Sequence, residues 1–322
     1  MHIPDGFLDS KTAVAAAVLA ATGLGVALRQ ARLHLPPRRV PLLGLAAAFV
    51  FAAQMINFPV AGGTSGHLIG AVLAAVLLGP SAAVIVISAV LIVQCLMFAD
   101  GGISALGANI FNMGVIGGVG GWAIYRVVSR LVKGLFGCVV AATFAAWCST
   151  VMASIACAGE LAVSRTVRWS VALPAMAGVH MLIGIGEGLI TALVLVAIAR
   201  ARPELLQPDE ATGRTRSYGT IAAYGGLIAL GLALFVSPLA SRWPDGLDRT
   251  AEVLGFKEKA VAPIVPAPIP DYEMPGIQWS TLGTSIAGAV GTVVVFALAW
   301  LFACALVPKG KPDRAGSPRD VP

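Results

Sequence analysis

The chain has 322 residues, of which 57% are hydrophobic and only 12% are charged, and its mean hydropathy is +0.86. Soluble domains carry about 25% charged residues, so the composition excludes a large soluble catalytic domain and indicates an all-α integral membrane protein. The formal net charge is +6. The basic residues nevertheless form short clusters between apolar segments, which is typical of membrane topology and argues against a nucleic-acid partner.

Nine apolar stretches approach the length of about 20 residues that a membrane-crossing helix needs. We expect spans near residues 11–33, 40–59, 65–79, 81–99, 104–128, 134–157, 171–199, 218–237 and 281–306. The third is short and closely joined to its neighbours, so a re-entrant or tilted arrangement stays open there. The first seven predict a seven-helix bundle, and the last two predict a two-helix C-terminal unit.

Polar stretches divide the chain into a bundle and a smaller unit. Residues 201–216 hold two prolines and a run of charges, typical of a cytoplasmic linker, although an ordinary internal loop fits the composition equally well. A Pro-rich outer loop is expected within the second unit, and its prolines between 263 and 270 forbid a helix there. The expected parts are a bundle at 1–200, the linker at 201–216, a two-span unit at 217–308 with its outer loop at 237–278, and a basic cytoplasmic tail at 309–322.

The positions of Lys and Arg predict the orientation in the cell membrane, because cytoplasmic loops retain these residues. With the N-terminus outside and the C-terminus inside, most basic residues fall on the cytoplasmic side. That side then holds Arg29, Arg32, Arg38, Arg39, Arg126, Arg130, Lys133, Arg200, Arg202, Arg214, Arg216, Lys309, Lys311, Arg314 and Arg319. The first residues and the segment around His67 are placed together on the outer side.

The first two residues offer an unusual set of nitrogen ligands. The Met1 amine, the backbone nitrogen of His2 and the His2 imidazole can close two chelate rings on one cation, and His67 can supply a fourth nitrogen. Four nitrogens in a plane suit Ni²⁺ or Cu²⁺, whereas Zn²⁺ asks for a tetrahedron. No basic leader precedes this segment, so we expect Met1 to remain the first residue. The alternative is that His2 is a solvent-exposed terminal residue and that His67 is only a loop or helix-capping residue.

Several motifs in the first 200 residues resemble the CbiM/NikM family. They are Met1 to Leu8, Gln54 to Val60, Gly63 to Gly70, Ala99 to Gly102, Ala105 to Gly114 and His180 to Gly188. Members of this family are the membrane-embedded substrate-binding components of energy-coupling factor importers for nickel or cobalt. The resemblance implies that the metal is held by the terminal amine, by the backbone and imidazole nitrogens of the second residue, and by His67.

The C-terminal part resembles a second family. The motif Trp243 to Glu252, followed by Leu254 to Phe256 and Pro270 to Glu273, is similar to the two-span NikN-type component with its Pro-Asp-Gly-Leu-Glu loop. Asp248 stands where Glu is usual. The resemblance implies a fused NikMN-like chain, in which the small component aids metal loading of the larger one. Pro244 to Leu247 also echoes Pro4 to Phe7, although Pro-Asp-Gly is a common turn.

Polar residues near the two histidines are candidates for orienting the metal ligands. They are Gln54, Asn57, Thr64, Ser65, Asn109 and Asn112. The alternative role of these residues is hydrogen bonding between helices. For Gln94, a further amide, this alternative is favoured at least as much as a role in orienting the metal ligands. His180 and Glu187 share one helix face. For Glu187 an internal hydrogen-bond or ion pair is favoured over metal binding, and the role of His180 stays open.

The predicted function is the capture and uptake of a divalent transition metal. Ni²⁺ is the expected metal, and it is a substrate and not a cofactor. No Gly-Lys-Ser or Gly-Lys-Thr is present, so ATP hydrolysis is expected on partner chains, a transmembrane coupling subunit and ABC ATPases. No nucleophile and base are spaced for catalysis, which argues against an enzyme. The alternatives are Co²⁺ uptake for cobalamin synthesis, a secondary metal transporter using Glu187, and a metal-sensing receptor.

Overall fold

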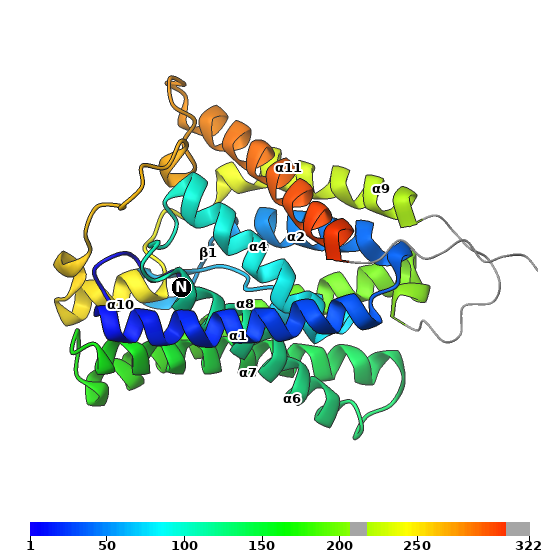
Figure 1. Ribbon diagram of the computed structural model, residues 1–322, viewed down its shortest axis with the longest axis horizontal. Helices are drawn as coiled ribbons and strands as arrows, with labels where there is room; N and C mark the ends of the chain where they lie inside the picture. Colours follow the sequence, from blue (N-terminus) through cyan, green and yellow to red (C-terminus); the bar gives the residue numbers. More distant parts are fainter. Residues whose placement is uncertain (207–217, 307–322) are drawn as a thin grey trace, which may run out of the picture.

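The computed structural model describes residues 1–206 and 218–306 of the chain. Six helices in this part are long and apolar enough to cross a membrane, which confirms a helical protein with several membrane spans. Five of them are α1 (Ser10–His34), α4 (Pro80–Phe98), α7 (Gly134–Val163), α8 (Trp169–Ala201) and α11 (Ser280–Leu306). The sixth begins as α9 (Tyr218–Gly231) and continues to Leu239. These helices run roughly along the long axis of the molecule (Figure 1).

The remaining helices of the first 206 residues are shorter or interrupted. Helix α2 (Val40–Gln54) has 15 residues and α3 (Ala71–Leu78) has eight. From Leu106 to Val128 the chain is helical throughout, as α5 (Leu106–Asn109), a π-helical segment (Ile110–Gly120) and α6 (Gly121–Val128). A helix of eight residues is about 12 Å long and cannot cross a bilayer.

The expected span at 65–79 is therefore wrong in its first half. Residues Phe58–Pro59 (β1) pair antiparallel with Ser65–Gly66 (β2) in a small hairpin, and α3 begins only at Ala71. Gly70, directly before the helix, has a φ of +75°, a conformation that glycine adopts at low cost. The apolar run continues through this segment, but its glycines turn the chain before a long helix can form.

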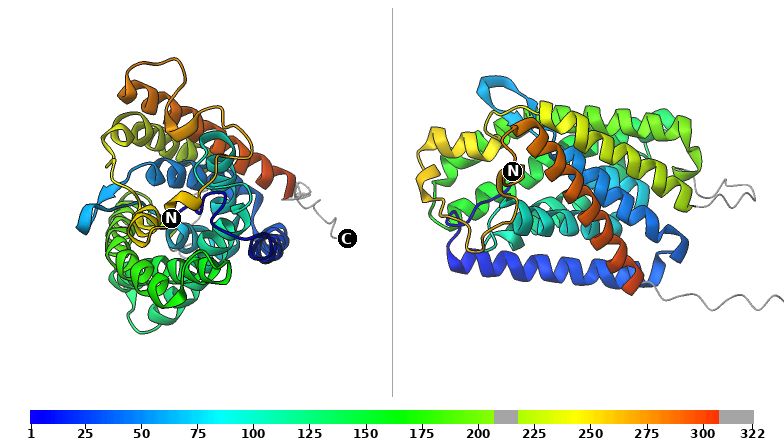
Figure 2. Two further views of the ribbon diagram at one scale, coloured as in Figure 1. Left: turned by 90° about the vertical axis from the view of Figure 1, so that its left-hand side faces the viewer. Right: turned by 90° about the horizontal axis from the view of Figure 1, so that it is seen from above.

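The C-terminal unit packs on the bundle through small residues. A Cβ on Gly225 of α9 would lie 2.7 Å from the Leu45 side chain of α2, and one on Gly44 of α2 would lie 3.0 Å from the backbone of Phe296 in α11. Figure 2 shows α11 crossing obliquely over the bundle. Close approach of backbones through glycine is the usual means of joining helices where lipid supplies no hydrophobic driving force.

The segment 237–278 contains a helix that we did not predict. Helix α10 (Gly246–Leu254) begins after Asp245, whose carboxylate accepts a hydrogen bond from the N–H of Asp248 at 2.8 Å. An aspartate in this position stabilises a helix start. The prolines between 263 and 270 lie outside any α-helix, as expected. Helix α10 packs against α8 near the N-terminus of the chain (Figure 1).

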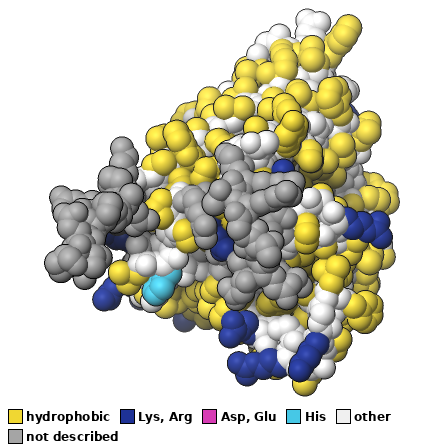
Figure 3. Space-filling model, turned by 90° about the vertical axis from the view of Figure 1, so that its right-hand side faces the viewer, with side chains coloured by type: hydrophobic (Ala, Val, Ile, Leu, Met, Phe, Trp, Pro, Cys, Tyr) yellow, Lys and Arg dark blue, Asp and Glu magenta, His cyan; other side chains and the backbone are white. Residues whose placement is uncertain are grey.

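The two ends of the molecule differ in charge. Figure 3 views the end reached by the last turn of α1, and several Lys and Arg side chains lie on it, with no Asp or Glu among the described side chains in view. Basic residues end three helices in this way: Arg32 in α1, Arg126 in α6 and Arg200 in α8. The predicted linker beyond residue 206 and the predicted tail at 309–322 lie outside the described residues.

Candidate metal centre

The N-terminal segment is folded into the bundle. Ile3 and Phe7 are fully buried, and the N–H of Ile3 donates to Oδ1 of Asn109 at 2.8 Å, while Nδ2 of Asn109 donates to the Ile3 carbonyl at 3.2 Å. Asp5 accepts hydrogen bonds from the N–H and the hydroxyl of Ser104. These contacts fix the segment before and within its Pro-Asp-Gly turn, and Met1 is buried in the interior.

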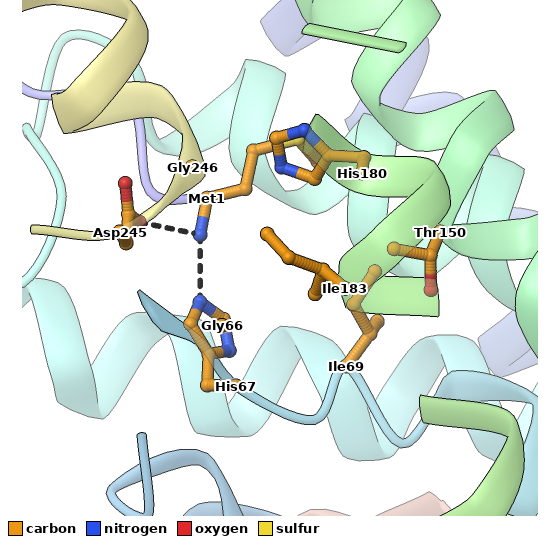
Figure 4. Close-up of a pocket in the computed structure, with 9 residues that line it drawn as sticks. All are labelled: Met1, Gly66, His67, Ile69, Thr150, His180, Ile183, Asp245 and Gly246. Carbon is orange, nitrogen blue, oxygen red and sulfur yellow. Dashed lines mark hydrogen bonds and ion pairs between the residues drawn. The ribbon is translucent and has the colours of Figure 1, made fainter. Parts of the chain in front are cut away.

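The Met1 amine lies between a histidine and a carboxylate. It is 2.6 Å from Nε2 of His67 and 2.8 Å from Oδ2 of Asp245 (Figure 4). His67 comes from the loop before α3, whereas Asp245 is 178 positions further along, at the start of α10. The first residue thus joins the two parts of the chain.

The hydrogen bonds of His67 determine which of its nitrogens holds a lone pair. Nδ1 lies 3.0 Å from the backbone carbonyl of Leu68. Because a carbonyl oxygen only accepts, Nδ1 carries the proton and Nε2 presents its lone pair to the Met1 amine. A ring nitrogen held by a backbone carbonyl is the usual arrangement of a histidine that binds a metal through its other nitrogen.

A chain of amides determines the state of His2 in the same way. Nε2 of Gln54 donates to the Ile69 carbonyl at 2.9 Å, and Nε2 of Gln94 donates to Oε1 of Gln54 at 2.9 Å. Oε1 of Gln94 is then free to accept, and Nε2 of His2 lies 3.2 Å from it. This order favours the proton on Nε2 of His2, whereas Nδ1, the nitrogen that a chelate with the backbone needs, faces the carboxyl group of Asp100.

The His2 ring is not yet turned toward the amine. Its Nδ1 lies 3.1 Å from Oδ1 of Asp100, whose second oxygen accepts from the Tyr272 hydroxyl at 2.6 Å. The rings of His2 and His67 stack with centroids 5.1 Å apart. The N–H of His2 has no hydrogen-bond partner in the described part of the chain. The backbone nitrogen is therefore available, and the imidazole is held close by.

Burial keeps both imidazoles neutral. Removal from water, together with the positive charge of the Met1 amine, lowers the pKa of His2 to about 3 and that of His67 to about 3. Burial alone would raise the pKa of Asp245, but the ammonium group, the His67 ring and the N–H of Asp248 hold the pKa of this carboxyl well below its usual range. Neutral imidazoles beside an ionised carboxylate are the states that metal binding requires.

The polar candidates divide into those that reach this centre and those that do not. Gln54 and Asn109 act on His2 and Ile3 as described, and the Ser65 hydroxyl donates to the carbonyl of Trp243 at 2.7 Å, which holds the loop that carries Asp245. The Asn57 and Thr64 side chains make no hydrogen bond within the described residues. Asn112 instead donates to Glu160 at 2.7 Å.

Three residues at the centre were not among the predicted site residues. Gln94 was considered chiefly for helix contacts, and it serves both Gln54 and His2. Asp100 and Asp245 were quoted only as parts of motifs. The echo of the Pro-Asp-Gly sequence was the one signal for Asp245, because it marked two similar turns in distant parts of the chain.

His180 and Glu187 of α8 have separate surroundings. Glu187 accepts hydrogen bonds from the N–H groups of Ile69 at 2.5 Å and Gly70 at 2.9 Å, and so holds the start of α3. Nδ1 of His180 lies 2.7 Å from the carbonyl of Met176. His180 lines a small cavity together with Met1, His67 and Asp245 (Figure 4).

Side chains alone do not make a metal site here. Within residues 1–206 and 218–306, no three His, Cys, Asp or Glu side chains are grouped so that they can hold a metal ion. A centre at Met1 therefore depends on the terminal amine and the backbone nitrogen as well as on the two imidazoles.

Comparison with known proteins agrees with these features. Residues 2–205 match the CbiM family, described as the cobalt uptake substrate-specific transmembrane region, and residues 219–307 match the PDGLE domain. A putative fused nickel transport protein NikMN of Archaeoglobus fulgidus is 38% identical over 300 residues, which cover 92% of this chain and 96% of that protein. The fused nickel transport protein NikMN of Rhodobacter capsulatus is 31% identical over 331 residues, covering 92% and 95%.

A crystal structure of a transition metal transporter is also similar. It superimposes with a TM-score of 0.58 at 34% sequence identity, covering 65% of this chain and 98% of that one. The match over residues 2–205, together with relatives aligned over nearly their whole length, shows that this chain belongs to the CbiM family and carries a PDGLE domain at its C-terminal end.

Proposed function

We propose that the chain captures Ni²⁺ outside the cell as the substrate-binding component of an energy-coupling factor importer. The ligands are the Met1 amine, the backbone nitrogen and Nδ1 of His2, and Nε2 of His67. The first domain acts as a seven-helix bundle and the last two spans as a loading unit. Co²⁺ taken up by the same mechanism is the alternative, in keeping with the description of the matched family.

The distance of 2.6 Å between the Met1 amine and Nε2 of His67 is the main support for this proposal. With metal–nitrogen bonds of about 2 Å, neighbouring corners of a square are about 2.8 Å apart. The two nitrogens are thus already spaced as adjacent ligands. The free N–H of His2 lies one residue away, which is the bond separation that a five-membered chelate ring requires.

Binding then needs one rotation. The His2 ring turns its Nδ1 from Asp100 toward the cation, while the amine loses the proton that it shares with Asp245 and His67. Asp100 and Asp245 remain beside the bound cation and lower the cost of its charge in a buried place. Four nitrogens in a plane favour Ni²⁺ over metals that prefer a tetrahedron or oxygen ligands.

The energy for transport comes from partners in this proposal. The sequence lacks the Gly-Lys-Ser/Thr of a P-loop, so an ATP-driven coupling module is required. A proton-coupled secondary transporter needs a carboxylate that is free to exchange protons, whereas Glu187 is engaged by two backbone N–H groups. The basic end of Figure 3 is then cytoplasmic, which places Met1 and α10 toward the outside.

Metal content is the direct test. The full chain with its native Met1, a variant with one additional N-terminal residue, and His67→Ala are each offered Ni²⁺ and Co²⁺, desalted, and analysed by mass spectrometry. We expect about one nickel per native chain, and loss of retention in both variants because each removes one corner of the square. Equal retention by the extended variant would show that the amine is not a ligand.

A further inference from the structure

The turn between α6 and α7 carries positive charge without a counter-charge. Arg126, Arg130 and Lys133 follow one another closely in the chain, and all three side chains are exposed. The sequence has no Asp or Glu between Asp100 and Glu160. None of the three cations forms an ion pair with an acidic side chain that the structure describes.

This basic turn stands out sideways from the bundle. Helix α6 diverges from α7, and its end projects away from the other helices (Figure 1), as the left view of Figure 2 also shows. Val127 is 60% exposed before the tip of the turn, and Phe136 is 76% exposed after it, in the first turn of α7. Because both lie within helical turns that lead back into the bundle, they are closer to the bilayer centre than the tip. Apolar and basic side chains in this order are typical of a segment at the surface of a membrane.

A tryptophan gives the depth of the first arginine. The Arg126 guanidinium lies over the Trp122 ring, 5.1 Å from its centroid. Tryptophan side chains gather where the hydrocarbon meets the lipid headgroups. An arginine stacked on a ring keeps its N–H edge free, and that edge fits two oxygens of a phosphate. Arg126 is thus placed at headgroup depth with its donors available.

We infer that the basic turn is a binding site for an anionic phospholipid. Arg126, Arg130 and Lys133 contact the phosphate and the headgroup, while Val127 and Phe136 contact the acyl chains. In the orientation that we propose, the turn meets the cytoplasmic leaflet, which is the one rich in anionic lipid. The sideways projection favours lipid over a soluble protein partner, because it directs the charges along the membrane surface.

Competition between two lipids tests this site. The full chain, purified in a neutral detergent, is offered equal amounts of dioleoyl phosphatidylglycerol and dioleoyl phosphatidylcholine, and the retained lipid is measured by native mass spectrometry. Both lipids have the same acyl chains, so a difference reports the headgroup. We expect the native chain to prefer phosphatidylglycerol. Combined Arg126→Gln, Arg130→Gln and Lys133→Gln should abolish this preference, at about fivefold for each charge removed.

A second triple variant is the matched control. Arg242→Gln, Arg249→Gln and Lys257→Gln remove the same charge from the segment 237–278, where Arg249 and Lys257 are already paired with Glu252. This variant should prefer phosphatidylglycerol as the native chain does. An unchanged preference after substitution of the basic turn would overturn the inference. Equal loss in both triple variants would also overturn it, because the lipid would then respond only to net charge.

Two further measurements separate this site from other roles. Phe136→Ser retains the three cations, so it should weaken both lipids alike and leave their ratio unchanged. A change in that ratio would contradict the assignment of headgroup and acyl contacts. The variant of the basic turn should retain nickel as the native chain does, which shows that it is folded and that the lipid site is separate from the metal centre. If it kept its lipid preference but no longer copurified with the coupling module, the turn would bind a protein, and the lipid site would be wrong.

Discussion

At the scale of single residues, three buried histidines have their protonated nitrogen fixed by a neighbour. The backbone carbonyls of Leu68 and Met176 do this for His67 and His180, and Gln94 does it for His2. Partners of this kind make a ligand nitrogen available without the cost of reorganising it when the metal arrives. His2 differs because its partner is a side chain, so its state depends on a replaceable residue.

Gln94→Leu is expected to weaken nickel binding by about 10–100-fold. The substitution removes the acceptor for Nε2 of His2, so the proton can move to Nδ1 and block the chelating nitrogen. Calorimetric titration of the purified chain with Ni²⁺ measures the affinity. Gln30→Leu, the same change at an exposed position of α1, should bind as the native chain does. Equal affinity of Gln94→Leu and the native chain would refute a role for the amide chain.

Nickel binding at pH 7 should release about two protons per ion. Burial and the nearby ammonium hold the pKa of His2 and of His67 at about 3, so both imidazoles are already without a second proton at this pH. The protons come instead from the Met1 ammonium and the His2 amide. Calorimetry in buffers of different ionisation enthalpy gives the number. One proton would exclude the amide as a ligand, and four would mean that both imidazoles are charged before binding.

At the scale of elements, the segment between α2 and α3 is fixed at three points. The β1–β2 hairpin closes its first half, and Ser65 binds the loop at Trp243. Glu187 of α8 accepts from the first N–H groups before α3, which have no partner within that helix. His67 stands between the second and third of these points, so its position is determined by two distant parts of the chain.

Removal of the Glu187 carboxylate should therefore loosen the His67 loop. Hydrogen bonds to a charged group contribute about 1.5–3 kcal/mol each, so Glu187→Ala should lower both Tm and nickel affinity, with Glu187→Gln intermediate because it retains one acceptor. Thermal unfolding followed by circular dichroism gives Tm, and calorimetry gives the affinity. Glu160→Gln alters a half-buried carboxylate, one paired with Asn112, and should leave nickel affinity unchanged. Normal affinity in Glu187→Ala would disprove this coupling.

The sequence predicted the long helices and the chelating order of atoms in Met1 and His2, because hydropathy and that order are local properties. His67, 66 positions from Met1, was placed with them by the resemblance to the family. The sequence did not predict the shortened α3, since the glycine turn before it is held by Glu187, 117 positions away from Gly70. Helix α10 was hidden by its charged residues and by the prolines of the segment around it. Asp245 was missed for the same reason as Glu187, because its partner, the Met1 amine, becomes a neighbour only in the folded chain.

At the scale of the whole molecule, the two parts of the chain meet over the N-terminus. Met1 is covered by the loop before α10, and the Asp5 carbonyl accepts from the N–H of Val261, so the PDGLE part closes over the first residues. The basic helix ends gather on another face (Figure 3). If the positive residues are cytoplasmic, the metal meets the C-terminal unit before it meets the amine.

This arrangement predicts opposite accessibility for two loops in intact cells. In a chain whose five cysteines are replaced, Glu258→Cys in the outer loop should react with a membrane-impermeant maleimide. Leu131→Cys, beside the basic end of α6 and 79% exposed, should react only after the membrane is permeabilised. Neither substitution removes a positive charge, so the orientation itself is undisturbed. Labelling of Leu131→Cys in intact cells would reverse the orientation and place the Met1 centre toward the cytoplasm, where it could not capture an incoming metal.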